Sequence, residues 1–293
     1  MPTRVALVVH PTRAVGRAVA TLDRWAGERG VPLVQLAVEG DEGRSLAAAG
    51  SLEPGDLVLA LGGDGTVLSA LRAAAPGDAP VLGIACGSLG ALSAVTADGL
   101  VDALDRVWAG DWTARALPAL AIDDGGGRHA WAANDFVVVR RGAGQLVAEL
   151  SIDDELYARV AGDGLIVATA LGSSAYSMAA GGPVLAAETP AFVCTPLAMH
   201  GGNAPPVVVG ADATATIVVQ PGFGGFDVEI DGHLQDLDAL EYDLCLHHEK
   251  LTLVTFGEPG LGLTMLRERG LIADSPRVLA RDRRAQPSPR SVR

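Results

Sequence analysis

The 293-residue sequence has a single lysine, Lys250, although Lys and Arg together number 22. Arginine therefore carries nearly all of the positive charge, and no lysine is available for the phosphate-binding turn of a P-loop. Cysteine is also scarce, because the three residues Cys86, Cys194 and Cys245 lie far apart without Cys-x-x-Cys spacing. This pattern predicts neither a disulfide framework nor a zinc site, and we interpret the three residues as buried thiols.

Long apolar runs are missing as well. Although 49% of the residues are hydrophobic, no run reaches the roughly 18 to 20 residues of a membrane span. The first residues, MPTRVALVVHP, are interrupted too early for a signal peptide. The formal net charge is −13, whereas nucleic-acid surfaces need clustered Lys and Arg. We therefore expect a cytoplasmic protein with neither a nucleic-acid nor a membrane partner.

Residues 1–100 alternate between strand-like and helix-like patterns. Four short apolar runs, RVALVVHP, VPLVQLAV, DLVLAL and APVLGIA, read as strands. The segment AVGRAVATLDRWAGERG and the alanine-rich stretch after DLVLAL have apolar residues at helical spacing. Strands that alternate with helices in this way indicate βαβ units. We predict an α/β amino-terminal domain with a parallel sheet.

Residues 101–256 have a different texture. After a helical segment, DGLVDALDRVWAG, short apolar strands alternate with glycine turns, which predicts a β-rich, all-β carboxyl-terminal domain. Near its end, LEYDLCL and KLTLVTF read as two strands separated by an exposed loop with His247 and His248. Residues 257–275 are expected to form a helix that returns to the first domain. Residues 276–293 are basic and lack an apolar cluster, so we expect a disordered tail.

The sequence LALGGDGTVLSALR places a carboxylate inside a glycine turn between a strand and a helix. In an open α/β sheet this position attracts phosphate, because the N–H groups of the next helix point at it. A carboxylate there would repel phosphate unless a cation or a hydroxyl lies between them. Asp64 could therefore ligate Mg²⁺ or accept the proton of an attacking alcohol. The alternative is that Asp64 caps the helix at Thr66, or that Gly-Asp-Gly is an ordinary turn.

Three further stretches have a similar character: GIACGSLGALS at 83–93, AANDFVVV at 132–139 and AGDGLIVATALGSSAYSMAAGGPVL at 161–185. The last is too dense in glycine and hydroxyl groups for a plain sheet strand. Together with GGDGT, with VEIDGH at 228–233 and with the order of the two domains, they resemble the NAD kinase family. This family is related in fold to the diacylglycerol and sphingosine kinases.

The resemblance implies an ATP- or polyphosphate-dependent kinase with a nucleotide site in the cleft between its domains, in a homodimer or homotetramer. Asp64 matches the catalytic aspartate, which activates the 2′-hydroxyl of the adenosine ribose of NAD. Mg²⁺ would arrive with ATP, and no protein metal site is expected. The implied phosphate and nucleotide loop comprises Gly62, Gly63, Gly65, Thr66, Gly87 and Gly90. The implied acceptor-binding residues are Asn134, Asp135, Asp163, Thr169, Ser174, Ala175 and Tyr176.

Each of these positions has a structural alternative. Tyr176 could be a core aromatic residue with a satisfied hydroxyl group. Asn134 and Asp135 could cap a turn. His10, at the end of the first strand, could face the cleft or be structural.

The sequence departs from the family pattern in two loops. The family shows Asn-x-Gly-Asn-Leu-Gly-Phe-Leu where this chain has ACGSLGAL, so Ala85 replaces an amide and Ala91 replaces a large aromatic residue. The family's Thr-Pro-Thr-Gly-Ser-Thr becomes TALGSS, and its Asn-Glu pair becomes Asn134 and Asp135. Three functions stay open: an NAD kinase, a kinase of the same fold for another hydroxyl acceptor, and a catalytically silent NAD(P)-binding regulator. An intact Asp64 argues against the third.

Overall fold

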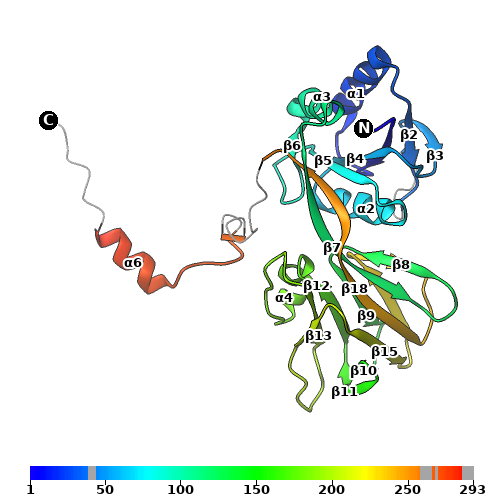
Figure 1. The fold of residues 1–293 in the computed structure, drawn as a ribbon. Coiled ribbons are helices and arrows are strands. Elements are labelled where there is room, and N and C mark those ends of the chain that lie inside the picture. Colours follow the sequence, from blue (N-terminus) through cyan, green and yellow to red (C-terminus); the bar gives the residue numbers. More distant parts are fainter. Residues whose placement is uncertain (39–43, 258–265, 268–269, 286–293) are drawn as a thin grey trace. The chain divides into compact units, whose positions relative to one another are not determined.

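The computed structural model describes residues 1–38, 44–257, 266–267 and 270–285 (Figure 1). The chain divides into two compact units, Met1–Pro259 and Gly260–Arg293. Within the described residues, none of the helices has the length and apolar character needed to cross a membrane.

The amino-terminal part of the first unit is the expected parallel sheet with helices. Its strands lie side by side in the order β3-β2-β1-β4-β5, and every neighbouring pair is parallel. The strands are β1 (Arg4–Val9), β2 (Leu33–Leu36), β3 (Ala48–Gly50), β4 (Asp56–Gly62), β5 (Pro80–Ala85) and β6 (Val95–Thr96). The helices are α1 (Gly16–Arg29), α2 (Asp64–Ala74) and α3 (Leu100–Ala109), with 3-10 turns η1 (Ala75–Gly77) and η2 (Ala97–Gly99).

Both faces of this sheet are covered, which explains why its strands read as continuous apolar runs. Alternate residues of β1 and β4, including Leu7 and Leu59, pack with α1 and α3 in one core. The residues between them, including Val8 and Ala60, pack against α2 in a second core on the other face. Ligands of such sheets collect at the carboxyl ends of the strands, where β4 meets α2.

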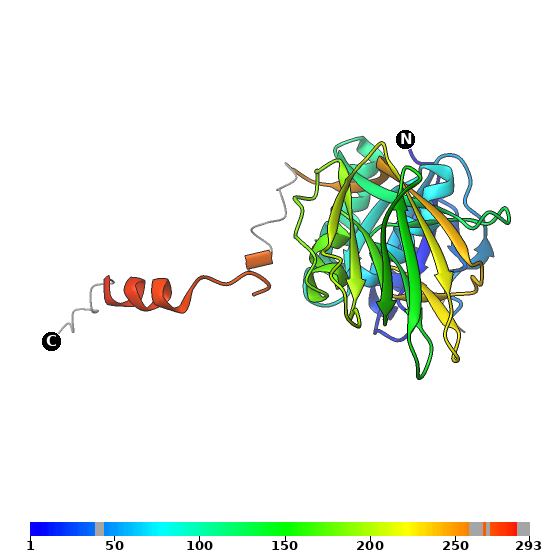
Figure 2. The same cartoon turned by 90° about the horizontal axis from the view of Figure 1, so that it is seen from below.

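The carboxyl-terminal part of the first unit consists of antiparallel strands (Figure 2). One sheet has the order β14-β13-β12-β9-β16-β17. It packs on the strands of the larger sheet around Phe136, Ile217 and Tyr242. The strands are β7 (Thr113–Asp123), β8 (His129–Ala132), β9 (Asp135–Arg140), β10 (Leu146–Ile152), β11 (Glu155–Gly162), β12 (Gly164–Thr169), β13 (Ala191–Leu197), β14 (Val207–Gly210), β15 (Thr214–Gln220), β16 (Phe226–Ile230), β17 (His233–Gln235) and β18 (Glu241–Thr255). Two short turns of helix, η3 (Gly172–Ser174) and α4 (Tyr176–Ala179), follow β12.

The two parts share one sheet, which the sequence did not indicate. Strand β18 is antiparallel to β7 and β15 and then pairs in parallel with β5 through Thr252 and Leu253. The two strands expected over LEYDLCL and KLTLVTF are therefore one strand, and the loop expected at His247 and His248 is an irregularity in it. The fold class, an α/β domain followed by an all-β domain, is confirmed.

The second unit is described by itself. It contains helix α6 (Pro276–Ala285), where we expected a disordered tail over residues 276–293. Proline at the first helical position followed by Arg, Leu and Ala favours a helix, and the basic composition obscured this signal. The helix expected over 257–275 falls largely on residues 258–265 and 268–269, which lie outside the described residues, as do residues 286–293 of the tail.

Candidate active site

The GGDGT turn leads from the end of β4 into the start of α2. Gly63 is the extended residue before the helix, and Asp64 is the first helical residue. A Cβ on Gly62 would lie 2.1 Å from Thr66 Oγ1, so only glycine lets the strand end fold against the helix there. Local packing therefore requires glycine at position 62. The turn that this glycine permits places Asp64 at the amino-terminal end of α2.

The second glycine loop, after β5, holds the Asp64 carboxylate. The N–H of Ala91 donates to Oδ2 at 3.0 Å, and the N–H of Leu92 donates to Oδ1 at 3.1 Å. A Cβ on Gly90 would lie 1.9 Å from Oδ1, so a side chain there would displace the carboxylate. Asp64 is thus held between the two loops, and it is the first residue of α2, whereas Gly63 occupies the N-cap position.

A cavity of about 310 Å³ opens beside Asp64. The loop after β1 contributes His10 and Arg13, the GGDGT turn contributes Gly63 to Thr66, and β17 contributes His233. The His10 Nδ1 accepts the N–H groups of Thr12 and Arg13 at 3.2 Å and 3.1 Å. His10 therefore both faces the cavity and shapes its own loop, so the two alternatives expected for it hold together.

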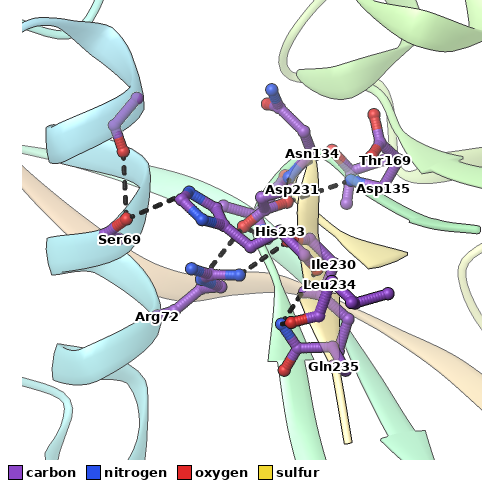
Figure 3. Close-up of polar contacts among 12 residues, drawn as sticks. Ser69, Arg72, Asn134, Asp135, Thr169, Ile230, Asp231, His233, Leu234 and Gln235 are labelled. Atoms are coloured by element: carbon purple, nitrogen blue, oxygen red, sulfur yellow. Dashed lines mark hydrogen bonds and ion pairs between the residues drawn. The ribbon is translucent and has the colours of Figure 1, made fainter. Parts of the chain in front are cut away.

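The expected acceptor pair, Asn134 and Asp135, lies where β8 passes into β9 and is held by the carboxylate of Asp231 (Figure 3). Asp231 Oδ1 accepts the N–H groups of Asn134 at 2.6 Å and Asp135 at 3.1 Å, and Oδ2 accepts that of Ala133 at 3.1 Å. Asp231 in turn has φ of 50°, in the left-handed region. Three successive N–H groups around one carboxylate fix the backbone of this pair.

Helix α2 is tied to the same cluster. Arg72 Nη1 donates to the carbonyl of Ile230 at 2.6 Å, and its Nε lies 3.7 Å from Asp231 Oδ2. One turn earlier on the helix, Ser69 Oγ lies 3.5 Å from His233 Nε2. The helix that begins with Asp64 is therefore connected to the loop of the acceptor pair (Figure 3).

Burial and neighbouring charge perturb the carboxyl groups of this cluster. Asp135 is 4% exposed, and burial, with the nearby Asp231 and Glu229, raises its pKa to about 7. Burial also raises the pKa of Asp231, although Arg72 and the three N–H groups oppose that rise. A carboxyl group that titrates near neutrality exchanges protons readily at working pH.

The segment after β12 folds against the acceptor pair. Thr169 is fully buried; its hydroxyl donates to the carbonyl of Ala133 at 2.7 Å and accepts the N–H of Gly172 at 3.0 Å. A Cβ on Gly172 would lie 2.1 Å from the carbonyl oxygen of Asn134. Ser174 Oγ donates to the carbonyl of Leu171 at 3.3 Å, and Ala175 closes the turn through its N–H. Thr169 thus contacts backbone groups on both sides, and its hydroxyl links the loop before Asn134 to the turn at Gly172.

Tyr176 opens α4 and is 42% exposed, so the core aromatic alternative is wrong. Burial raises the pKa of its hydroxyl, with Glu229, Asp135 and Asp163 adding to the rise. Asp163 directly precedes β12, whereas Thr169 ends that strand. The carboxylate of Asp163 forms an ion pair with Arg140 at 2.5 Å. Within one chain Asp163 therefore lies at the opposite end of β12 from Thr169.

Several residues of the site were not predicted. Arg13 lies outside the stretches that suggested function, whereas Ser69, Arg72 and His233 lie inside such stretches but were not singled out. The sequence VEIDGH contributed only to the resemblance, although a lone acidic residue before Gly at a strand end is a sign of a turn that binds backbone N–H groups. The interactions of these residues join distant parts of the chain, so spacing alone does not reveal them.

Comparison with known proteins matches both halves of the chain. Residues 51–112 match the model of the ATP-NAD kinase N-terminal domain, and residues 133–240 match that of the ATP-NAD kinase C-terminal domain. The NAD kinase of Koribacter versatilis is 36% identical over 241 residues, which cover 78% of this chain and 84% of that protein. The chain belongs to the NAD kinase family. NAD kinase 1 of Streptomyces avermitilis is 32% identical over 95% of this chain and 90% of its own length.

Solved structures of the family have the same fold. A yeast NADH kinase complexed with NADH superposes with a TM-score of 0.74 at 20% identity, covering 94% of this chain and 89% of the yeast chain. An NAD kinase from Archaeoglobus fulgidus in complex with ATP superposes with a TM-score of 0.67 at 22% identity. The match covers 92% of this chain and 100% of the Archaeoglobus chain.

One departure from the NAD kinase pattern, Ala91, lies beside Asp64, because its N–H donates to the Asp64 carboxylate. Ala85 ends β5 and is 1% exposed, so its small side chain is enclosed by the fold. Ala91 is partly buried against the core below α2, while Leu89 in the same loop is 56% exposed. The backbone contacts to Asp64 hold this loop in place. The side chains of the loop are small or apolar.

The described residues contain no group of three or more His, Cys, Asp or Glu that could hold a metal ion. The cysteines are unpaired thiols; Cys194 is buried, whereas Cys86 and Cys245 are half-buried. The donor set at the cavity suits Mg²⁺ carried by a nucleotide, because this ion keeps several waters and is held by one or two carboxylates together with phosphates. Asp64 is the carboxylate of the cavity lining that would contact it.

Proposed function

We propose that this protein is an NAD kinase that transfers the terminal phosphate of ATP to the 2′-hydroxyl of the adenosine ribose of NAD. The observation that carries the proposal is the placement of Asp64. It lies in a cavity between the two glycine loops, held by the N–H groups of Ala91 and Leu92, in a chain of the NAD kinase family.

In this mechanism the Asp64 carboxylate accepts the proton of the 2′-hydroxyl as its oxygen attacks the terminal phosphorus. The bond from phosphorus to the bridging oxygen breaks, and ADP leaves with the electron pair of that bond. The start of α2, with its positive end of the helix dipole, favours the negative phosphate beside Asp64. Positioning and electrostatic stabilisation supply most of the catalysis in phosphoryl transfer.

The acceptor would be held by the second part of the molecule. Asn134 and Asp135 offer polar groups on a backbone fixed by Asp231, and the half-exposed ring of Tyr176 offers a stacking surface for adenine. Ser174 and Ala175 precede this ring in the same turn. Mg²⁺ would supply charge neutralisation on the transferring phosphate and would be held chiefly by the phosphates of the donor, which leaves the Asp64 carboxylate to act as the base.

A second candidate is a kinase of the same chemistry with another hydroxyl acceptor. Ala85 and Ala91 favour it, because they remove an amide and an aromatic side chain that shape the acceptor pocket in the family. The homo-oligomer, the cytoplasmic location and the role of Asp163 stay predictions. Light scattering on the purified protein would test the oligomer.

The experiment that tests the proposal is a screen of acceptors with ATP and Mg²⁺, in which ADP release is followed and each product is identified by mass. NAD should give the highest kcat/KM and a product one phosphate heavier. A nucleoside or sugar that exceeds NAD would favour the second candidate. Replacement of ATP by polyphosphate in the same assay identifies the donor.

A further inference from the structure

We propose that Arg13 binds the phosphates of the donor, as the cation of the cavity beside Asp64. The inference rests on the proposed function and adds the donor subsite to it. The ligand would be a phosphoanhydride chain, whether that of a nucleoside triphosphate or of an inorganic polyphosphate.

The guanidinium of Arg13 lies across both glycine loops. A Cβ on Gly63 would be 3.0 Å from Arg13 Nη1, and a Cβ on Gly87 would be 3.5 Å from the same nitrogen. These glycines follow β4 and β5, whose carboxyl ends adjoin in the sheet. One arginine side chain therefore spans the turn that opens α2 and the loop that holds Asp64.

The loop that carries Arg13 is held in place from two sides. His10 Nδ1 accepts the backbone N–H groups of Thr12 and Arg13. Arg44 Nη1 donates to the carbonyl of Arg13 at 2.6 Å and to that of His10 at 3.2 Å. Such bracing reduces the conformational entropy that a ligand must remove on binding.

Two other cations of the described chain are engaged elsewhere. Arg72 bonds the carbonyl of Ile230 and pairs with Asp231. Lys250, the one lysine of the chain, has its Nζ 2.6 Å from Asp78 and over the ring of Trp131. Among the described residues that line the cavity, Arg13 is the sole Arg or Lys.

The charge of the cavity requires such a group. A donor carries several negative charges into a space that already contains the Asp64 carboxylate. A guanidinium offers N–H donors in a planar fork that fits phosphate oxygens in pairs. Arg13 thus takes the place of the lysine that other phosphate-binding turns use.

The test compares Arg13→Met and Arg13→Lys with the matched control Arg17→Met. Arg17 also lies near the start of α1, but its side chain is 92% exposed and reaches only Asp98, at 3.8 Å. Steady-state kinetics would vary ATP and NAD separately, and calorimetry with Mg²⁺ would measure binding of ATP, of inorganic tripolyphosphate and of NAD. Thermal melting would check that each variant is folded.

Arg13→Met should raise the KM for ATP and weaken tripolyphosphate binding by roughly 10- to 100-fold, the scale of one or two charge-assisted contacts. NAD binding without ATP should stay within about twofold, and Arg13→Lys should recover part of the loss. Loss of ATP binding with unchanged tripolyphosphate binding would overturn a phosphate contact. Equal behaviour of Arg13→Met and Arg17→Met would overturn the inference even if the wild type phosphorylates NAD. A wild type without NAD kinase activity whose tripolyphosphate binding needs Arg13 would support the subsite and refute the proposed function.

Discussion

The carboxylate of Asp231 joins helix α2 to the loop of Asn134 and Asp135, so Asp231→Asn should weaken the fold and the proposed acceptor site together. The substitution keeps the shape of the side chain. It also keeps a residue type that tolerates the left-handed backbone at this position, where φ is 50°. The measured effect would therefore report the charge and its hydrogen bonds, with little contribution from backbone strain.

The magnitude follows from the partners that are lost. If the amide oxygen takes the place of Oδ1, the amide nitrogen faces the N–H of Ala133, and one buried donor loses its acceptor. An unsatisfied buried donor costs about 1 to 3 kcal/mol. Arg72, whose side chain is 12% exposed, also loses its counter-charge. Removing one partner of a buried ion pair costs about 3 to 5 kcal/mol, but the release of a buried carboxylate offsets part of it. We expect a net loss of about 2 to 4 kcal/mol in the free energy of unfolding.

Urea unfolding at pH 7, followed by tryptophan fluorescence, would measure this loss, with Asp227→Asn as the control. Asp227 lies on β16, the strand that ends directly before Asp231, and it pairs with Arg141, which is 62% exposed. Its substitution should cost less than about 1 kcal/mol, as surface pairs do. The KM for NAD should rise in Asp231→Asn and stay unchanged in the control. If the two variants lose equal stability, the account of Asp231 as the anchor of the acceptor loop is wrong.

Three further predictions concern the same site. The folded-state pKa of Asp135, about 7, exceeds its ordinary value of 3.8, so the native state binds more protons between these values and its stability falls as pH rises through them. Between pH 5 and pH 8, the free energy of unfolding of Asp135→Asn should therefore rise relative to that of the wild type by on the order of 2 to 4 kcal/mol, as measured by urea unfolding. If the difference in unfolding free energy between the two proteins is the same at both pH values, the raised pKa is contradicted. Gly90→Ala would place a Cβ 1.9 Å from Asp64 Oδ1, so it should lower kcat/KM by about 10²-fold. The control Gly27→Ala, which has open space for a Cβ, should keep the wild-type kcat/KM. Equal kcat/KM in the two variants would refute the role of Gly90 in making room for the Asp64 carboxylate. Ala91→Phe should lower the KM for NAD by about tenfold if the pocket binds NAD. A higher KM for NAD in a variant that keeps the wild-type melting temperature would show that the pocket is built around alanine.

Local patterns were enough to predict much of the fold. The runs RVALVV and DLVLAL read correctly as strands because both faces of their sheet are covered, by α1 and α3 on one side and α2 on the other. The Gly-Asp-Gly turn was placed correctly because a strand and a helix flank it. In contrast, the four polar residues HHEK inside β18 read as a loop, although pairing with β7 on both sides of the irregularity keeps them in one strand.

The site was predictable only where a motif marks it. Asp64, Asn134 and Tyr176 became candidates because they lie in stretches that resemble the family pattern. Arg72 and Asp231 are 159 positions apart in the chain, and their pairing depends on how two sheets pack. Arg13 and Arg44 act through backbone carbonyls and glycine turns, which leave no spacing pattern.

The central claim is that Asp64 activates the acceptor hydroxyl, and the most direct test is the rate of NADP formation by Asp64→Asn at saturating ATP, Mg²⁺ and NAD. NADP would be measured with an NADP-specific dehydrogenase, which requires the phosphate at the 2′ position, and NAD binding would be checked by calorimetry. We expect NAD binding within a few-fold of wild type and a turnover lower by about 10²- to 10⁴-fold, the contribution of a positioned general base. Near-normal turnover in a folded variant that binds NAD would contradict the account.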